Sequence, residues 1–265
     1  MNVVPALRGK VSSPCKVAAA PANGALGSLA VESVSFAIGS IPILSDVSVR
    51  VGHGEIVGLL GRDGSGKTCL FELLAGLVAP TSGRILLNGA EVTKLAADER
   101  ARHGLAYLPE EPSIFRELTV EENISLALDL LEPNEAIRSD RLEALLKTFL
   151  LQKVRTQSAT SVSGGERRRC EVARALAAQP AILMLDEPFR GLDPMSVAEV
   201  ARVVAVLREV QIGVLISDYD LHYLIGLIDR AYVLHEGRVI FSGTAAQMMD
   251  DPVVRHLYLG ESFAL

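Results

Sequence analysis

The sequence predicts an α/β fold with a mixed, largely parallel sheet core, an antiparallel β-subdomain and a helical subdomain. Residues 29–38 and 43–51 alternate apolar and polar side chains, which is typical of antiparallel strands. Residues 55–60 and 181–186 are short apolar runs, as expected for parallel strands that are covered on both faces. Between these two runs, residues from about 98 to 178 have the pattern of helices.

The composition is that of an ordinary globular protein. Of its 265 residues, 49% are hydrophobic and 22% are charged, which is enough for a sizeable core. The net charge of −6 offers no basic excess to hold a phosphate backbone, so we expect no nucleic-acid partner. Cys15, Cys69 and Cys170 have no CxxC spacing, which argues against disulfide or zinc frameworks. No apolar run approaches the roughly 18–20 residues of a membrane-spanning helix, so action at a membrane would require docking onto another protein.

Residues 1–28 differ in composition from the rest of the chain. They are rich in Ala, Pro, Ser and Gly, and basic residues and prolines interrupt any apolar segment of the kind a signal peptide needs. We interpret them as a disordered extension, with organelle targeting as the alternative. Residues 29–265 are then expected to form one domain, with the helical lobe at about 98–178 and a C-terminal tail at about 246–265.

The remaining elements follow from periodicity and from turn residues. A strand that ends in Asn88-Gly89 has a typical turn signal after it, and alternating helices and strands in the last third indicate an α/β lobe. The expected elements are helix 67–77, strand 84–88, helices 97–103, 119–131, 134–151, 164–178 and 194–210, strand 212–217, helix 219–227 and two strands near 230–241.

The segment 61–68 reads GRDGSGKT and matches the phosphate-loop pattern GxxxxGK[ST] between an apolar strand and a helix. Glycines let backbone N–H groups converge on phosphate oxygens, and the helix N-terminus adds a favourable dipole. Lys67 is expected to reach the β- and γ-phosphates and Thr68 to hold Mg²⁺. The predicted ATP-binding residues are Gly61, Arg62, Asp63, Gly64, Ser65, Gly66, Lys67 and Thr68.

The apolar strand 181–185 ends in Asp186 and Glu187. Ligands of open α/β sheets bind at the carboxyl ends of strands, so both acids should face the phosphates. We expect Asp186 to hold Mg²⁺ through water and Glu187 to act as the general base for the attacking water. The alternative is a pair of exposed loop acids.

Residues 162–166 read VSGGE and open a predicted helix. A serine followed by two glycines at a helix N-terminus can bind an anion. Taken alone, the segment is better explained as a helix cap. Its position about 20 residues before the strand that ends in Asp-Glu makes it more specific. The residues concerned are Ser163, Gly164, Gly165 and Glu166.

The order of phosphate loop, SGGE segment and Asp-Glu strand resembles that of ABC ATPases, from residue 29 to about residue 245. The resemblance implies a P-loop NTPase fold of the ABC type that uses ATP and Mg²⁺. It also implies that two copies pair head to tail, so that the SGGE signature of one closes on the ATP held by the other. By the same resemblance, Gly191, Leu192 and Asp193 form the D-loop that couples the two sites.

Two stretches are similar to the ATP-binding subunits of lipopolysaccharide exporters, YLPEEPSIFRELTVEEN at 107–123 and the ending RHLYLGESFAL. This resemblance implies two copies beneath two membrane subunits, on the cytoplasmic face of the inner membrane. It also implies that Ile114, Phe115 and Arg116 line a groove for the membrane partner, although such residues can equally be core. ATPases of branched-chain amino-acid importers share part of the central stretch and are the alternative.

Three positions depart from the ABC pattern. Glu110 stands where a glutamine is usual, although a carboxylate can still bind Mg²⁺. Tyr219 stands at the position of the switch histidine and cannot be a cation near neutral pH; His222, one turn later, is a weak substitute. Ile38 stands where an aromatic ring stacks on adenine, with Phe36 as a neighbour on the same face and a buried strand residue as the alternative. Slow hydrolysis, or a nucleotide-gated binding module, is therefore a further hypothesis.

Overall fold

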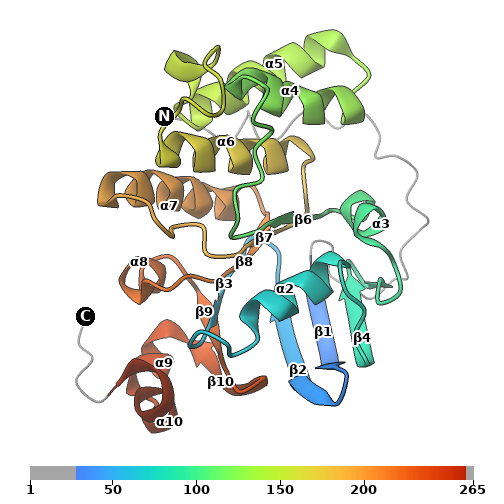
Figure 1. Ribbon diagram of the computed structural model, residues 1–265, viewed down its shortest axis with the longest axis vertical. Helices are drawn as coiled ribbons and strands as arrows, with labels where there is room; N and C mark the ends of the chain where they lie inside the picture. Colours follow the sequence, from blue (N-terminus) through green and yellow to red (C-terminus); the bar gives the residue numbers. More distant parts are fainter. Residues whose placement is uncertain (1–27, 261–265) are drawn as a thin grey trace.

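The computed structural model describes residues 28–260, so the predicted extension at the N-terminus lies almost entirely outside the described residues, as does the end of the predicted tail. Two sheets and the helices around them make up the molecule (Figure 1). One sheet has six strands in the order β10-β9-β3-β8-β7-β6, and the other has four in the order β2-β1-β4-β5. This mixture of a mainly parallel and an antiparallel sheet is the predicted fold class.

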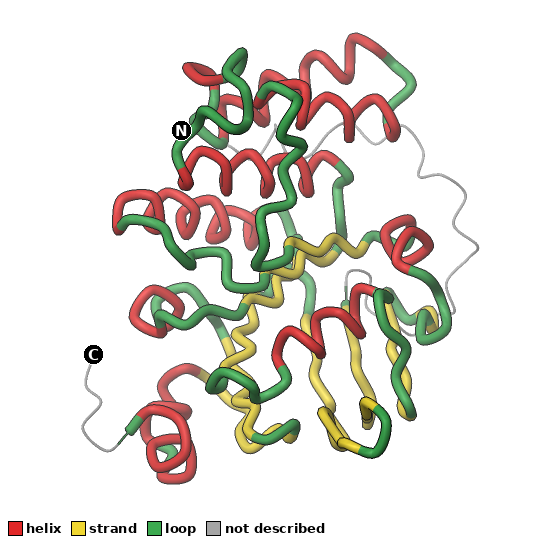
Figure 2. The backbone as a smooth tube through the Cα atoms, viewed as in Figure 1, coloured by secondary structure: helices red, strands yellow, loops and turns green. Residues whose placement is uncertain are grey.

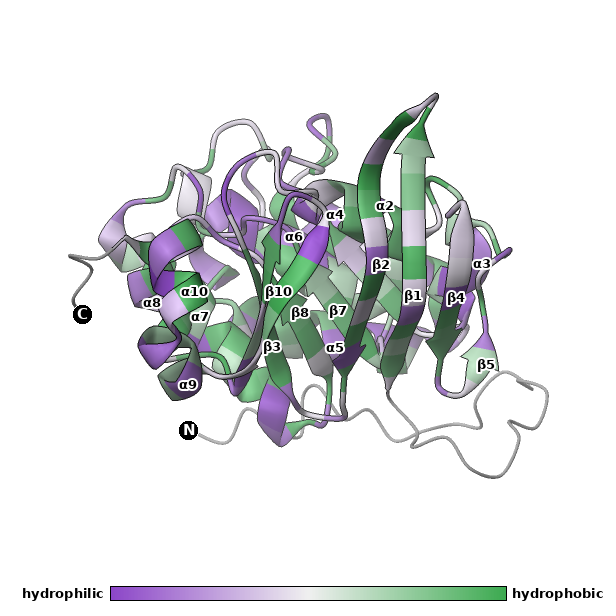
Figure 3. Cartoon of the chain, turned by 90° about the horizontal axis from the view of Figure 1, so that it is seen from below, coloured by the Kyte–Doolittle hydropathy of each residue, from purple (hydrophilic) through white to green (hydrophobic). Residues whose placement is uncertain are grey.

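The six-stranded sheet places the strands that lead into the site side by side. Strand β3 pairs in parallel with both β8 and β9, and β7 lies in parallel between β8 and β6, whereas β10 is antiparallel to β9. Every residue of β3, β7 and β8 is buried, because both faces of this sheet are covered. Figure 3 shows these strands as largely hydrophobic. The strands are β3 (Ile56–Leu60), β6 (Leu105–Leu108), β7 (Ile182–Leu185), β8 (Gly213–Ile216), β9 (Arg230–His235) and β10 (Arg238–Thr244).

Strand β6 was not expected, because we predicted only helices in this part of the chain. It is four residues long, too short for a clear alternation of apolar and polar side chains. Pairing with β7 decides its structure, with Leu105 opposite Ile182 and Leu108 opposite Leu185. The prediction of a purely helical segment from 98 to 178 is therefore wrong at this point, and the correction matters because β6 leads into the loop that carries Glu110.

The antiparallel sheet contains β1 (Leu29–Ile38), β2 (Ile41–Val51), β4 (Ser82–Leu87) and the short β5 (Ala90–Glu91). Strands β1 and β2 pair in the predicted antiparallel arrangement and form a hairpin, in which β2 begins two residues earlier than expected. At its tip, 63% of Ile38 and 64% of Ile41 is exposed. The alternative interpretation of Ile38 as a buried residue is wrong, since the hairpin extends beyond the core.

The helices between residues 120 and 209 lie together on one side of the six-stranded sheet (Figure 1). The helices at 67–75 and 97–102 lie beside the antiparallel sheet. Capping boxes begin α4 at Thr119 and α6 at Ser163. Helix α5 ends three residues before the predicted boundary, followed by Leu150 in a left-handed conformation with φ 55°. The helices up to α8 are α2 (Lys67–Ala75), α3 (Ala97–Arg102), α4 (Val120–Leu131), α5 (Glu135–Thr148), η1 (Gln152–Val154), α6 (Gly164–Ala177), α7 (Pro194–Glu209) and α8 (Leu221–Ile225).

The C-terminal segment is helical rather than a plain tail. It consists of α9 (Ala245–Asp250), α10 (Pro252–Val254) and the π-helical turn η2 (Arg255–Leu259). Met248 and Val254 are fully buried in the larger of the two core clusters, so this segment is packed against the domain. Among residues 28–260, no helix has the length and apolar character needed to cross a membrane.

Candidate nucleotide site

The phosphate loop connects β3 to α2 and depends on its glycines. Gly61, Gly64 and Gly66 all have positive φ angles, of 149°, 75° and 103°. A Cβ atom on Gly61 would lie 2.3 Å from the carbonyl oxygen of Leu234, and one on Gly66 would lie 2.8 Å from the side chain of Leu44. The loop can therefore keep this conformation only with glycine at both positions.

Two polar side chains of the loop fit a bound polyphosphate. Lys67 is a buried residue, and its Nζ atom donates hydrogen bonds to the carbonyl oxygens of Gly61, at 2.8 Å, and Arg62, at 3.1 Å. The hydroxyl of Ser65 is buried and has no hydrogen-bond partner among the described residues. A buried polar group without a partner is costly. Phosphate oxygens would accept hydrogen bonds from Ser65 and from Lys67, so the loop is suited to this ligand.

Asp186 follows directly after β7 and is fully buried. Its Oδ1 atom accepts a hydrogen bond from the Ser217 hydroxyl at 2.7 Å, and its Oδ2 atom has no partner among the described residues. Burial raises the pKa of Asp186, while Ser217 and Thr68 partly oppose this effect. A buried carboxylate with a free oxygen beside the Thr68 hydroxyl suits Mg²⁺, which takes few protein ligands and completes its shell with phosphate and water.

Glu187 is held beside this carboxylate in an unusual backbone conformation. Its φ angle is 44°, which is rare for a side chain of this kind and is often found at functional sites. Its backbone N–H donates to the Ser217 carbonyl at 3.1 Å and lies 3.2 Å from the Ser217 hydroxyl. Only 8% of Glu187 is exposed. Ser217, directly after β8, thus positions both acids, and no motif in the sequence marks it.

Glu110 is paired with an arginine that the sequence analysis also missed. One nitrogen of Arg190, Nη1, contacts Oε1 of Glu110 and lies 3.0 Å from Oε2 of Glu187. These residues lie in the loops after β6 and after β7 (green in Figure 2), and β6 and β7 are neighbouring strands of the sheet. Glu110 and Arg190 are 80 positions apart in the sequence, so only the folded structure shows that they form an ion pair.

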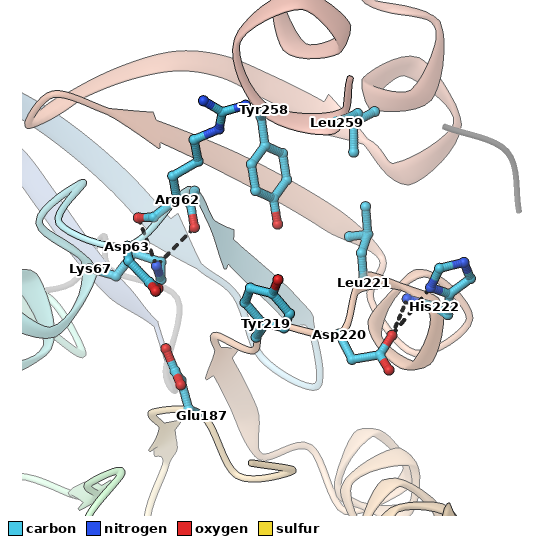
Figure 4. Close-up of a pocket in the computed structure, with 11 residues that line it drawn as sticks. Arg62, Asp63, Lys67, Glu187, Tyr219, Asp220, Leu221, His222, Tyr258 and Leu259 are labelled. Carbon is cyan, nitrogen blue, oxygen red and sulfur yellow. Dashed lines mark hydrogen bonds and ion pairs between the residues drawn. The ribbon is translucent and has the colours of Figure 1, made fainter. Parts of the chain in front are cut away.

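The switch position lies on the other side of Glu187, in the loop after β8. Tyr219 is 81% exposed and lines the same cavity as Lys67. His222 points away from Lys67 beyond Asp220 (Figure 4), and its Nδ1 atom lies 3.3 Å from the Asp220 carboxylate. His222 nevertheless lines the same cavity as Lys67 and Tyr219, so it lies near the switch position but does not face the lysine.

Tyr258 brings the C-terminal segment into the site. Tyr258 lines the cavity together with Gly61, and burial raises its pKa to about 12, an effect that the Gly61 backbone partly opposes. Figure 4 shows the Tyr258 and Tyr219 side chains facing each other across the pocket. In the sequence, the YLGE ending indicates only a family resemblance, and its place in the site follows from the fold. The cavity between them measures about 630 Å³, within the range of ligand sites. Its lining residues are Gly61, Arg62, Asp63, Lys67, Glu187, Tyr219, Asp220, Leu221, His222, Tyr258 and Leu259.

The SGGE segment caps α6 and also presents an open glycine. The Ser163 hydroxyl accepts from the backbone of Glu166 at 3.2 Å, and the Glu166 carboxylate accepts from Ser163 in return. Gly165 is buried, and a Cβ atom there would lie 2.2 Å from the Ser196 hydroxyl. A Cβ atom on Gly164 would meet only ordinary contact. Among the residues described, none from 163 to 166 lines the cavity at Lys67.

The D-loop and the predicted partner groove also have defined positions. Asp193 caps α7 by accepting hydrogen bonds from the backbone of Met195 and Ser196, and the preceding Gly191 has a φ angle of 71° and lines a pocket with Leu192. In the predicted groove, Phe115 and Arg116 are exposed, and Arg174 lies 4.7 Å above the Phe115 ring. Ile114 is only 8% exposed and belongs to the core, so the expectation that it lines an open groove is not met.

A glycine loop with an inward lysine, a buried aspartate beside a threonine and a strained glutamate define a P-loop ATPase site. The ABC transporter family model matches residues 44–190, more than half of the chain. The chain belongs to the ABC transporter family, whose ATP-binding subunits bind ATP with Mg²⁺ and hydrolyse it.

Curated relatives agree over most of the chain. A probable ABC transporter ATP-binding protein of Azorhizobium caulinodans is 47% identical over 90% of this chain and 85% of its own length. The lipopolysaccharide export system ATP-binding protein LptB of Acidithiobacillus ferridurans is 46% identical, over 84% of this chain and 92% of its own. LptB of Escherichia coli K12 is 42% identical, over 84% and 93%.

Solved structures of ABC transporter ATP-binding proteins have a similar fold. An ATP-binding subunit of an ABC transporter superposes with a TM-score of 0.75 at 30% identity, over 86% of this chain and 94% of that one. The ADP conformation of the ATP-binding cassette MJ1267 gives a TM-score of 0.78 at 25% identity, over 88% and 98%.

Proposed function

We propose that this chain is the ATP-hydrolysing subunit of a transporter that extracts lipopolysaccharide from the inner membrane. In this proposal two copies bind beneath two membrane subunits on the cytoplasmic face. The observation that carries it is the likeness to LptB proteins over most of both chains, combined with an ATP site whose parts lie together. The resemblance of the YLPEEPSIFRELTVEEN stretch and of the YLGE ending supports the same assignment.

In the proposed mechanism, the loop 61–68 binds the phosphates through its backbone and Lys67. Thr68 would hold Mg²⁺ directly, and Asp186 would hold it through water. Bound Mg²⁺ would neutralise charge on the phosphate oxygens. Glu187 accepts a proton from the attacking water. The signature residues 163–165 of the second copy close on the γ-phosphate from the other side, because a helix N-terminus stabilises an anion.

Exposed residues of the helical lobe provide the proposed contact with the membrane subunits. Phe115 is 47% exposed, and its ring is held by the stacked guanidinium of Arg174. Arg174 also donates hydrogen bonds to the carbonyl and the hydroxyl of Ser113, both at 2.8 Å. A rigidly held aromatic ring beside the exposed Arg116 is suited to receive a helix of a partner protein.

The role of Glu187 is tested by Glu187→Gln. Loss of a general base lowers kcat by about 10²–10⁴-fold, and we expect this loss with ATP binding retained, because Gln is isosteric. Steady-state ATPase assays and a fluorescent-nucleotide titration measure the two effects. The control is Glu32→Gln, at a surface ion pair with Arg84 in the antiparallel sheet. Full activity in Glu187→Gln would show that another group is the base.

The transporter is tested by co-purification from the native membrane, followed by reconstitution into liposomes. We expect membrane subunits that release lipopolysaccharide when ATP is added, with Glu187→Gln as the inactive control. Membrane subunits that instead import branched-chain amino acids would establish the alternative function and contradict the export proposal.

Slow turnover is a second proposal, motivated by the exposed tyrosine at the switch position. Tyr219 offers a neutral hydroxyl where a histidine can offer a cation to the γ-phosphate. We therefore expect Tyr219→His to raise kcat several-fold in the complete transporter, with little change in KM. Equal turnover of the two proteins would remove this argument, and a parent protein that binds ATP without hydrolysing it would favour a nucleotide-gated module.

A further inference from the structure

Arg190 joins two acids from different loops at the centre of the candidate site. Its Nη1 atom contacts Glu110 and also lies 3.0 Å from Glu187, three residues earlier in the chain. Glu110 follows β6 and Glu187 follows β7, so the contact spans 80 positions of sequence. The three residues also line a single pocket together with Gly164 of the signature segment.

The charges explain why an arginine is needed here. Two carboxylates that both reach one nitrogen atom must lie close together, and like charges at that distance repel. One of them, Glu187, is nearly buried, so solvent screens it poorly. The pKa of Arg190 is raised by Glu110 first, then by Glu187, and Asp63 of the phosphate loop contributes in the same direction. Three acids therefore act on Arg190 before any nucleotide binds, in a pocket that Arg167 and Arg168 also line.

Exposure alone would not distinguish Arg190 from an ordinary surface arginine. Its side chain is 61% exposed and its partner Glu110 is 35% exposed, while the Arg84–Glu32 pair of the antiparallel sheet has 61% and 34%. Isolated pairs of that kind contribute little. The difference lies in the second acid, because Arg190 binds the carboxylate that we assign as the base, whereas Arg84 is remote from the site.

We propose that Arg190 is a positioning residue for ATP hydrolysis, which cancels the charge of Glu110 beside the γ-phosphate and holds the Glu187 carboxylate in place. The proposal rests on the proposed role of Glu187. Glu110 and Arg190 together have no net charge, so the pair is electrostatically equivalent to a neutral amide at position 110. Loss of Arg190 alone leaves two unpaired acids facing the phosphates, and neutralising both members restores the balance.

The test is a double-mutant cycle of Arg190→Ala, Glu110→Gln and the combined variant, with Arg84→Ala as a control of equal exposure. The measurements are kcat and KM for Mg-ATP, and binding of a fluorescent ATP analogue in EDTA. We expect Arg190→Ala to lower kcat and to weaken metal-free binding, each by roughly fivefold, because an uncompensated carboxylate near the phosphates repels the nucleotide. The combined variant should recover most of both losses, and Arg84→Ala should match the parent.

Rescue separates a charge effect from a structural one, because a merely structural contact is not restored by removing its partner. A combined variant no better than Arg190→Ala, or an Arg190→Ala protein equal to the parent in both measurements, would overturn the proposal. Arg190→Gln repeats the test if the alanine variant is unstable. If Glu187→Gln retains full activity, the function assigned to Glu187 fails, while binding in EDTA still decides whether Arg190 compensates Glu110.

Discussion

At the scale of single residues, the site contains an acid, Asp186, whose burial opposes its ionisation. Asp186 is fully buried, one of its oxygens has no partner among the described residues, and burial raises its pKa above 3.8. An acid whose pKa is raised on folding favours the protonated form in the native state. The ionised form therefore costs stability, and this cost is present once the pH rises above the unfolded value.

We predict that Asp186→Asn stabilises the protein in EDTA and removes the stabilisation by Mg-ATP. Removing the charge should raise the Tm by about 2–4 °C for each kcal/mol gained in a chain of this size. The parent in EDTA should lose stability relative to the variant as the pH rises above about 4, because only the parent ionises there. Differential scanning fluorimetry with and without Mg-ATP measures both effects. A variant less stable than the parent in EDTA, with an unchanged Mg-ATP shift, would contradict this account.

At the scale of elements, helix α2, which follows the phosphate loop, is held at its C-terminus by one buried arginine. Arg100 of α3 is 1% exposed and donates to the carbonyl oxygens of Leu73 at 2.6 Å and Leu74 at 2.8 Å, in the last turn of α2. It also donates to Thr93 and Leu95, so all of these contacts are to backbone carbonyls. A cation at a helix C-terminus complements the dipole whose N-terminus faces the phosphates.

We predict that Arg100→Met lowers the free energy of unfolding by about 3 kcal/mol or more, because several buried carbonyl groups lose their donor at once. Urea denaturation measures this change. The matched control is Arg102→Met in the same helix, whose side chain is 74% exposed and paired with Asp98, and a change within about 0.5 kcal/mol is expected there. Equal effects of the two substitutions would mean that the buried hydrogen bonds of Arg100 add nothing to the free energy of unfolding.

At the scale of the whole molecule, the candidate site is expected to be shared between two copies. The cavity at Lys67 is lined by the phosphate loop, the loops after β7 and β8, and η2, and it has no lining residue from the described segment 163–166. Gly164 has room for a side chain, whereas Gly165 does not. The signature can therefore be altered at Gly164 without disturbing the packing of α6 on α7.

We predict complementation between Lys67→Ala and Gly164→Asp chains in the assembled transporter. Each variant alone should be inactive, because one lacks the phosphate-binding lysine and the other places a negative charge at the anion site. Random pairing makes about half of the dimers mixed, and each mixed dimer has one intact composite site out of two. If one site suffices for hydrolysis, the mixture should therefore regain roughly a quarter of the parent activity. ATPase activity of co-expressed chains measures this, and a mixture as inactive as its components would contradict a shared site.

Local spacing along the chain determines much of the fold and much of the nucleotide site. The glycine pattern of 61–68, the apolar strand before Asp186 and the alternation of 29–38 each predict a backbone conformation from neighbouring residues. The caps at Ser163 and Asp193 are local in the same way. The fold class and the family followed from the order of these features, because each is encoded within a few residues.

Tertiary structure decided what depends on residues that are far apart in the chain. The four residues of β6 become a strand only by pairing with β7, and Tyr258 reaches Gly61 only because the C-terminal helices pack against the domain. The contact of Glu110 with Arg190 likewise depends on the order of strands in the sheet. Periodicity reports which side chains share a face of one element, whereas the neighbours across elements follow from packing. The phosphate loop was thus determined by the sequence itself, and the charges that surround it by the fold.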